Sequence, residues 1–152
     1  MSIEVGQLAP DFEIKNQFGE LVKLSDLRGE QNVVLVFFPY AFTPRCTAEL
    51  CTIRDERTSL EGEDTVVLGI SNDPVPSLKA FAEQSKIEYS LLSDFYPHGA
   101  VSKAYGVFLE DKGFATRATF VIDKAGVVRW SVLNTPADVR DTDEYRAALA
   151  AL

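Results

Sequence analysis

The chain has 152 residues, the length of one compact domain, and we expect a single domain over residues 1–152. Its 46% hydrophobic and 25% charged residues are typical of a globular protein and argue against disorder or a fibrous repeat. A net charge of −8 disfavours nucleic acid and anionic membrane surfaces as partners, because both would repel it.

The N-terminus lacks the basic region and apolar core of a signal peptide. The longest apolar run, from Val33 to Phe38, is too short to cross a bilayer. We therefore expect a cytoplasmic protein with no membrane partner.

The first quarter of the chain predicts β-structure. Residues 8–24 alternate in polarity around the turn signal Asn16–Gly19, which indicates an N-terminal β-hairpin. Residues 25–29 are typical of one helical turn, capped by Ser25. The apolar run Asn32–Pro39 is rich in β-branched residues and predicts a strand that is covered on both faces.

The rest of the chain alternates between helices and strands. Thr43 is a typical N-cap, Pro44 suits the first helical position, and the helix should end before Gly62. The further expected elements are a strand at 65–71, a helix at 75–85, a strand within 89–94, a helix at 99–105, a hairpin of 118–123 and 127–132, and a helix at 142–152. This order predicts an α/β fold in which a mixed central sheet has helices on both faces.

The small numbers of cysteine and histidine limit the chemistry. The chain has two cysteines and one histidine, His98. In a cytoplasmic protein, two cysteines are more typical of free thiols than of a structural disulfide. Together with one histidine they fall short of the four ligands of a closed zinc site, so we expect no metal. Any mechanism in which histidine activates serine or cysteine would have to use His98, which we expect to be a helix-start residue instead.

Cys46 lies three residues after the predicted N-cap, at the position that glutamate takes in a capping box. An ionised sulfur there would meet unpaired helical N–H groups, the Thr43 hydroxyl and the positive end of the helix, with Arg45 adding a cation. These groups favour a reactive thiolate. The alternative is a structural cysteine that merely lies near a helix start.

Cys51 follows five residues later on the same predicted helix. On a helical wheel it lies roughly 140° from Cys46, whereas Leu50, Ile53 and Leu60 share the arc of Cys46. Five helical residues separate the two Cα atoms by roughly 8–9 Å, and a disulfide needs less than about 7 Å. A Cys46–Cys51 disulfide would therefore require the first helical turns to unwind. The alternative for Cys51 is a small hydrophobic residue without a redox role.

The stretch PYAFTPRC, residues 39–46, matches the P-x-x-x-T-x-x-C signature of the peroxiredoxins. TPRCTAELCTIRD, residues 43–55, resembles the bacterioferritin-comigratory (PrxQ) group, which has a second cysteine five residues after the first. LVFFPYAFT, LLSDFYPHGAVSKAYGVF (residues 91–108) and RATFVID (residues 117–123) are similar to the AhpE-type peroxiredoxins. The resemblance covers most of the chain and implies a thioredoxin-like fold.

The resemblance also implies roles for single residues. Cys46 takes the place of the peroxidatic cysteine, Thr43 that of the hydroxyl that binds peroxide oxygen, Pro39 that of the residue that shields the pocket, and Arg117 that of the active-site arginine. Before the match, Arg117 is only a charge at a strand start, and a solvated surface arginine is the favoured interpretation. Glu49 occupies a position that is often acidic in the PrxQ group, although it also suits a helix surface. Typical AhpE-type proteins have one cysteine, so Cys51 makes this chain a hybrid.

The implied reaction is reduction of hydrogen peroxide and organic hydroperoxides, with peroxynitrite as a further candidate, through a Cys46 sulfenic acid. Cys51 or an outside thiol (thioredoxin, a glutaredoxin-like protein or a low-molecular-weight thiol) would reduce it, and no cofactor is required. One alternative is a redox sensor that passes its oxidation to a partner. Another, a thioredoxin-type disulfide reductase, would require C-x-x-C, which this chain lacks.

Aromatic residues are dense around the expected pocket, and most of them suit simple core filling. Four lie in predicted loops: Tyr40, Phe42, Phe95 and Tyr96. Similar loops in the family help to form a dimer interface, so the resemblance implies a homodimer.

Overall fold

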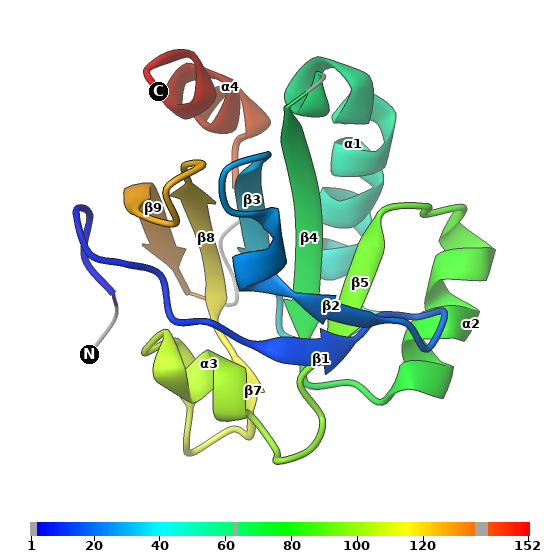
Figure 1. Ribbon diagram of the computed structural model, residues 1–152. Helices are drawn as coiled ribbons and strands as arrows, with labels where there is room; N and C mark the ends of the chain where they lie inside the picture. Colours follow the sequence, from blue (N-terminus) through cyan, green and yellow to red (C-terminus); the bar gives the residue numbers. More distant parts are fainter. Residues whose placement is uncertain (1–2, 63, 136–139) are drawn as a thin grey trace.

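The computed structural model describes residues 3–62, 64–135 and 140–152. At its centre lies a five-stranded sheet with the strand order β5-β4-β3-β8-β9. Its strands are β3 (Asn32–Phe37), β4 (Thr65–Ser71), β5 (Ser90–Ser93), β8 (Arg117–Ile122) and β9 (Val128–Asn134). β3, β4 and β5 are parallel, whereas β8 is antiparallel to both β3 and β9. The predicted mixed sheet is confirmed (Figure 1).

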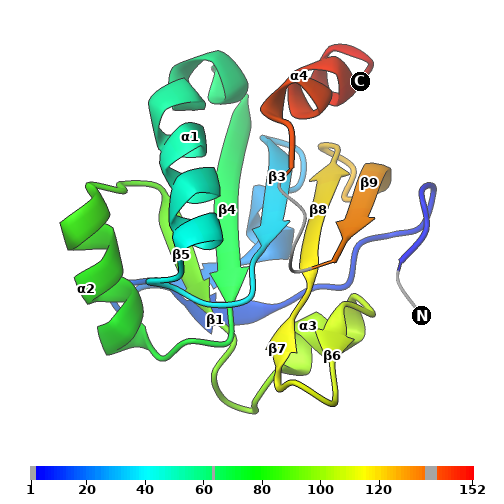
Figure 2. The same ribbon diagram turned by 180° about the vertical axis from the view of Figure 1, so that it is seen from behind.

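Helices cover both faces of this sheet, as expected. One face carries α1 (Pro44–Glu61), α2 (Val75–Ser85) and α4 (Thr142–Ala150), whose buried residues share one apolar cluster. The opposite face carries the short helix α3 (Ala100–Ala104) and the N-terminal hairpin of β1 (Glu13–Lys15) and β2 (Leu21–Lys23). Figures 1 and 2 show the two faces in turn.

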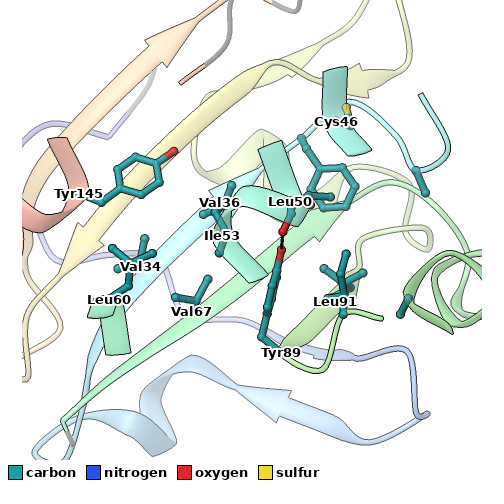
Figure 3. Packing of buried hydrophobic residues seen from close by; sticks show 14 of the residues in the cluster. Val34, Val36, Cys46, Leu50, Ile53, Leu60, Val67, Tyr89, Leu91 and Tyr145 are labelled. Atoms are coloured by element: carbon teal, nitrogen blue, oxygen red, sulfur yellow. Dashed lines mark hydrogen bonds between the residues drawn. The ribbon is translucent and has the colours of Figure 1, made fainter. Parts of the chain in front are cut away.

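Strand β3 illustrates why the apolar runs of the sequence form the core. Successive side chains of a strand point to opposite faces. Val34 and Val36 pack under α1, whereas Leu35 and Phe37 pack against the hairpin side. All four side chains are inaccessible to solvent, so no polar alternation appears in the sequence of this strand. Figure 3 shows the α1 side of this packing.

The structure corrects two details of the predicted elements. The turn expected at residues 25–29 is the 3-10 helix η1 (Leu24–Leu27), and its N-cap is Lys23 rather than Ser25. The sequence also gave no sign of the small hairpin of β6 (Phe108–Leu109) and β7 (Phe114–Ala115). Strands of two residues are too short to show a period of two. Among the described helices, none is long and apolar enough to cross a membrane.

The topology brings two distant segments of the chain together at one end of the sheet. β3 and β8 are antiparallel, and Phe37 at the end of β3 pairs with Ala118 near the start of β8. Arg117, the first residue of β8, therefore lies beside the loop that leads from β3 into α1.

Candidate active site

Helix α1 begins where the sequence predicts. Thr43 is its N-cap, with extended backbone angles (φ −89°, ψ 149°), and Pro44 is the first helical residue. The Thr43 hydroxyl, however, donates to the carbonyl oxygen of Tyr40 at 3.0 Å. A hydroxyl has one proton to donate, so in this conformation it does not donate to the Cys46 sulfur, and that part of the expectation is wrong. Its lone pairs remain able to accept a hydrogen bond.

Cys46 lies in the first turn of α1 and is fully buried. Its apolar neighbours in the core cluster include Leu50 and Ile53, as the helical wheel predicts. Its sulfur accepts a hydrogen bond from Nη1 of Arg117 at 3.2 Å. This contact joins the start of α1 to the start of β8, residues that are 71 positions apart in the sequence.

Glu49 lies one helical turn after Cys46 and is 5% exposed. Its Oε1 accepts from Nη1 of Arg117 at 2.7 Å and from Nη2 of Arg140 at 2.8 Å. Its Oε2 accepts from the backbone N–H of Arg140 at 2.6 Å and from Nε at 3.1 Å. The surface alternatives for Glu49 and for Arg117 are therefore both wrong, since both side chains are 3% exposed.

The ion cluster of Glu49, Arg117 and Arg140 holds two cations and one carboxylate. Burial alone would raise the pKa of Glu49, but the hydrogen bonds and charge of Arg140, together with the charge of Arg117, lower that pKa below its ordinary value of 4.5. The carboxylate is therefore ionised at neutral pH. Nη1 of Arg117 also brings its positive charge to the Cys46 sulfur.

Arg140 is the member of this cluster that sequence reasoning missed. Its Nη1 donates to the carbonyl oxygens of Phe37 at 2.6 Å and of Ala118 at 2.9 Å. It thereby bridges the paired ends of β3 and β8 as well as binding Glu49. In the sequence it is an isolated arginine just before the final helix, a position typical of a surface charge. The only signal was indirect, because a buried glutamate on α1 requires a buried cation.

A cavity of about 620 Å³ opens above this cluster. Its lining residues are Pro39, Tyr40, Thr43, Pro44, Arg45, Phe114 and Arg117. The rings of Tyr40 and Phe114 meet edge to face at 5.0 Å and form an aromatic part of the wall. Arg117 both lines the cavity and contacts the Cys46 sulfur, so a ligand in the cavity lies next to the buried thiol.

Cys51 is partly exposed and lies on an unbroken helix, and both thiols are free. It lies outside the apolar cluster that contains Cys46, which agrees with its predicted place off the core-facing arc of the helix. Between the two cysteines, the carbonyl oxygen of Leu50 accepts a hydrogen bond of 2.7 Å from the hydroxyl of Tyr89 (Figure 3). Burial raises the pKa of Tyr89, which keeps this hydroxyl protonated as a donor.

His98 is exposed and bonds to loop backbone rather than to the ion cluster. Its ring nitrogens lie 3.2 Å from the carbonyl oxygen of Phe95 and 2.9 Å from that of Gly113. Gly99 directly after it is the N-cap of α3, which agrees with the expected place near a helix start.

A mixed sheet flanked by helices, with a buried cysteine at a helix start bonded to an arginine, defines a thioredoxin-like fold with a peroxiredoxin-type site. Residues 5–131 match the family model described as AhpC/TSA family. The chain therefore belongs to the AhpC/TSA family.

Individual relatives agree with this assignment. The chain is 49% identical to alkyl hydroperoxide reductase E of Mycobacterium tuberculosis, over 99% of this chain and 98% of the relative. It is 39% identical to peroxiredoxin Bcp of Bacillus subtilis, over 83% of this chain and 82% of the relative. The crystal structure of peroxidoxin BcpB from Mycobacterium tuberculosis superposes with a TM-score of 0.83 and 34% identity, covering 99% of this chain and 98% of that one. The resemblance to AhpE-type and bacterioferritin-comigratory proteins and the expected thioredoxin-like fold are confirmed.

Proposed function

We propose that this protein is a thiol-dependent peroxidase that reduces hydrogen peroxide and organic hydroperoxides, with Cys46 as its nucleophile. The observation that carries the proposal is the 3.2 Å contact between Nη1 of Arg117 and the Cys46 sulfur, beneath a cavity that Arg117 also lines. The cationic guanidinium of Arg117 beside the sulfur favours the thiolate, which is the nucleophilic form of cysteine. The relatives are named as hydroperoxide reductases and peroxiredoxins, which agrees with this chemistry.

In the proposed reaction, the Cys46 thiolate attacks the terminal oxygen of the peroxide and the O–O bond breaks. The attacked oxygen keeps its hydrogen, so Cys46 becomes a sulfenic acid. The other oxygen leaves as alkoxide or hydroxide and takes a proton from solvent to give an alcohol or water. Arg117 stabilises the charge that develops on the leaving oxygen, and a fixed donor of this kind is typically worth about 3–4 kcal/mol of barrier. The Thr43 hydroxyl accepts from the peroxide O–H, and Pro39, which has no N–H, offers no competing donor.

The sulfenic acid then condenses with a thiol, releasing water and forming a disulfide. We propose Cys51 as one such thiol and an external one as the other. A Cys46–Cys51 disulfide requires the first turns of α1 to unwind, because intact helical geometry holds the Cα atoms about 8–9 Å apart. A cytoplasmic location, as the sequence predicts, would supply thioredoxin, a glutaredoxin-like protein or a low-molecular-weight thiol as the final reductant.

We also propose that the protein is a homodimer. Four aromatic side chains in loops are exposed to solvent: Tyr40 (43%), Phe42 (52%), Phe95 (48%) and Tyr96 (85%). Large exposed aromatic side chains of this kind are enriched at protein interfaces.

Intact-mass measurement after one equivalent of peroxide tests the proposed function. We expect wild-type protein to lose two hydrogens if Cys51 resolves the sulfenic acid, and to gain one oxygen if an external thiol is required. Cys46→Ser should show neither change and consume no peroxide. The matched variant Cys51→Ser keeps the nucleophile and should gain one oxygen.

The same assay separates an enzyme from a redox sensor. An enzyme consumes peroxide repeatedly when a dithiol reductant is present, whereas a sensor reacts once. Peroxide consumption by Cys46→Ser at the wild-type rate would refute the role of Cys46. Equal turnover by Cys51→Ser and wild type with every reductant would refute a resolving role for Cys51.

A further inference from the structure

The segment between β3 and α1 carries both Pro39 and Thr43, yet it belongs to no helix or strand. Within it, Phe42 has a positive φ of 68°, a conformation that is unfavourable for a bulky side chain. Such a conformation persists only when the surroundings hold it in place. The ring of Phe42 meets that of Phe81 on α2 at 5.3 Å, but this contact fixes a side chain rather than the backbone.

The backbone of this segment is held by Asp73, a residue that the site described above does not include. Oδ2 of Asp73 accepts a hydrogen bond of 2.8 Å from the backbone N–H of Ala41. The same oxygen accepts one of 2.7 Å from the hydroxyl of Ser71, the last residue of β4. The carbonyl oxygen of Asp73 in turn accepts one of 2.6 Å from the hydroxyl of Ser93, the last residue of β5.

Asp73 is therefore fixed to the ends of two adjacent strands, β4 and the edge strand β5, and holds the amide of Ala41, which lies midway between Pro39 and Thr43. A hydrogen bond to an ionised acceptor is stronger than one between neutral groups. Ala41 itself is buried, which shields this bond from water. Thr43 bonds back to the carbonyl of Tyr40, so its hydroxyl follows the position of the segment that Asp73 holds.

We propose that Asp73 is a positioning residue of the peroxidase site, which sets the place of the Thr43 hydroxyl relative to the Cys46 sulfur. The expected effect of Asp73 on the rate of Cys46 oxidation rests on the proposed function. Its effect on the position of the segment between β3 and α1 does not. Displacement of a catalytic group by about 1 Å can slow a reaction by about a hundredfold. Arg117 reaches Cys46 from β8, on a different segment, and we expect this contact to persist when Asp73 is changed.

The test is a double-mutant cycle between Asp73 and Thr43, read as the second-order rate constant of Cys46 oxidation by hydrogen peroxide. We expect Asp73→Ala to lower this constant by about ten- to a hundredfold, within the range that misplacement can produce. Asp73→Asn keeps an oxygen acceptor and should retain most of the rate. If Asp73 acts through Thr43, the double variant with Thr43→Val should be no slower than Thr43→Val alone. A rate for Asp73→Ala within twofold of wild type, or a double variant showing the full product of both losses, would overturn the proposal.

Asp11→Ala is the matched control, because this carboxylate also accepts a backbone N–H, that of Ser25 at 2.9 Å. It lies on the hairpin side of the sheet, and its loss should leave the rate constant unchanged. A loss as large as that of Asp73→Ala would show a general effect of destabilisation and overturn the proposal. If Asp73→Ala does not fold, Ser71→Ala loosens the same carboxylate and should still lower the rate severalfold, whereas an unchanged rate would count against the proposal.

Amide hydrogen exchange of residues 40–43 in the reduced protein provides a second readout that needs no peroxide. Asp73→Ala should accelerate exchange there and leave residues 117–122 unchanged. Unchanged exchange at residues 40–43 overturns the proposal whatever the wild type does with peroxide. If wild type fails to consume peroxide but exchange rises as expected, the proposed function fails while the positioning of the segment stands.

Discussion

Arg117 uses one nitrogen for two acceptors, the Cys46 sulfur at 3.2 Å and the Glu49 carboxylate at 2.7 Å. Glu49 thus orients the guanidinium, and Arg140 compensates the charge of Glu49. At the scale of single residues, Arg140 shares the Glu49 carboxylate with Arg117, so this carboxylate does not pair with Arg117 alone.

We expect Arg117→Ala to slow the oxidation of Cys46 by hydrogen peroxide by about a hundred- to a thousandfold, because both thiolate and leaving oxygen lose their cationic donor. Stopped-flow measurement of peroxide consumption would give the rate. Alkylation of Cys46 by iodoacetamide at pH 7 should slow as well. Arg129→Ala is the matched control, since Arg129 forms a partly exposed ion pair with Asp123 on another part of the sheet. Equal rates for Arg117→Ala and Arg129→Ala would contradict the prediction.

Glu49 makes stability depend on pH. Its folded-state pKa is lower than its ordinary value of 4.5, so its contribution to the free energy of unfolding is fully present above that value. The contribution is lost as the pH falls through the lowered pKa. We expect urea denaturation of wild type to show a free energy of unfolding that decreases below pH 4.5, and Glu49→Gln to show a flatter dependence there.

At neutral pH, Glu49→Gln should cost about 3–5 kcal/mol, because it leaves two buried arginines without their carboxylate. Glu83→Gln on the exposed surface of α2 is the control and should change stability by less than about 0.5 kcal/mol. Identical pH dependences for Glu49→Gln and wild type would show that the ion cluster does not hold the pKa of Glu49 down.

At the scale of elements, α1 carries both thiols, and a hydrogen bond from outside the helix restrains its backbone between them. The Tyr89 hydroxyl reaches over from the start of the β5 segment and binds the Leu50 carbonyl oxygen at 2.7 Å. Unwinding of the first turns of α1 therefore has to break a buried tertiary hydrogen bond as well as helical ones. This bond opposes the very movement that a Cys46–Cys51 disulfide requires.

We expect Tyr89→Phe to lower the free energy of unfolding by about 1 kcal/mol and to accelerate amide exchange across residues 46–52. If unwinding limits resolution, the Cys46–Cys51 disulfide should also form faster, as followed by quenched mass spectrometry. Tyr105→Phe removes an equivalent 2.7 Å bond, to the carbonyl of Pro10 on the hairpin side of the sheet. It should leave the rate of disulfide formation unchanged. A faster rate in both variants would indicate general loosening rather than a local restraint on α1.

The elements themselves were largely predictable because their signals are local. Thr43, Pro44 and Gly62 mark both ends of α1, and each acts through its own backbone geometry. The bounds of β4 and α2 follow in the same way from apolar runs and from the flanking polar residues. The β6–β7 hairpin was missed because it depends on pairing between two dipeptides rather than on any sequence period.

At the scale of the whole molecule, the proposed dimer can be tested by substituting its exposed aromatic side chains. Tyr96 is 85% exposed, and a dimer through its loop would bury it. We expect Tyr96→Asp to weaken self-association at least tenfold, because a two-fold axis places two new carboxylates in one interface. Sedimentation velocity over a range of concentrations would measure this.

Phe18→Asp is the control, as Phe18 is 60% exposed at the turn of the N-terminal hairpin. It should leave the dimer intact. A wild-type protein that sediments as a monomer at all concentrations would contradict the proposed dimer.

The sequence by itself determined the order of the elements apart from the β6–β7 hairpin, the sheet with two covered faces, and the placement of Cys46 in the first turn of α1. These features depend on the periodicity of apolar residues and on capping residues close in sequence. The family signature within residues 39–46 directed attention to Arg117 as well. Local signals of this kind can be recognised in a single sequence because each depends on only a few neighbouring residues.

Only the tertiary structure decided which charges meet. The contacts that unite Glu49 with Arg117 and Arg140 span 68 and 91 residues, and the one between Asp73 and Ala41 spans 32. In the sequence, each of these charged residues suits a solvated surface, because the sequence does not indicate whether a charged residue is buried. It becomes part of the site only when the antiparallel pairing of β3 and β8 and the docking of α1 remove it from water and supply its partner.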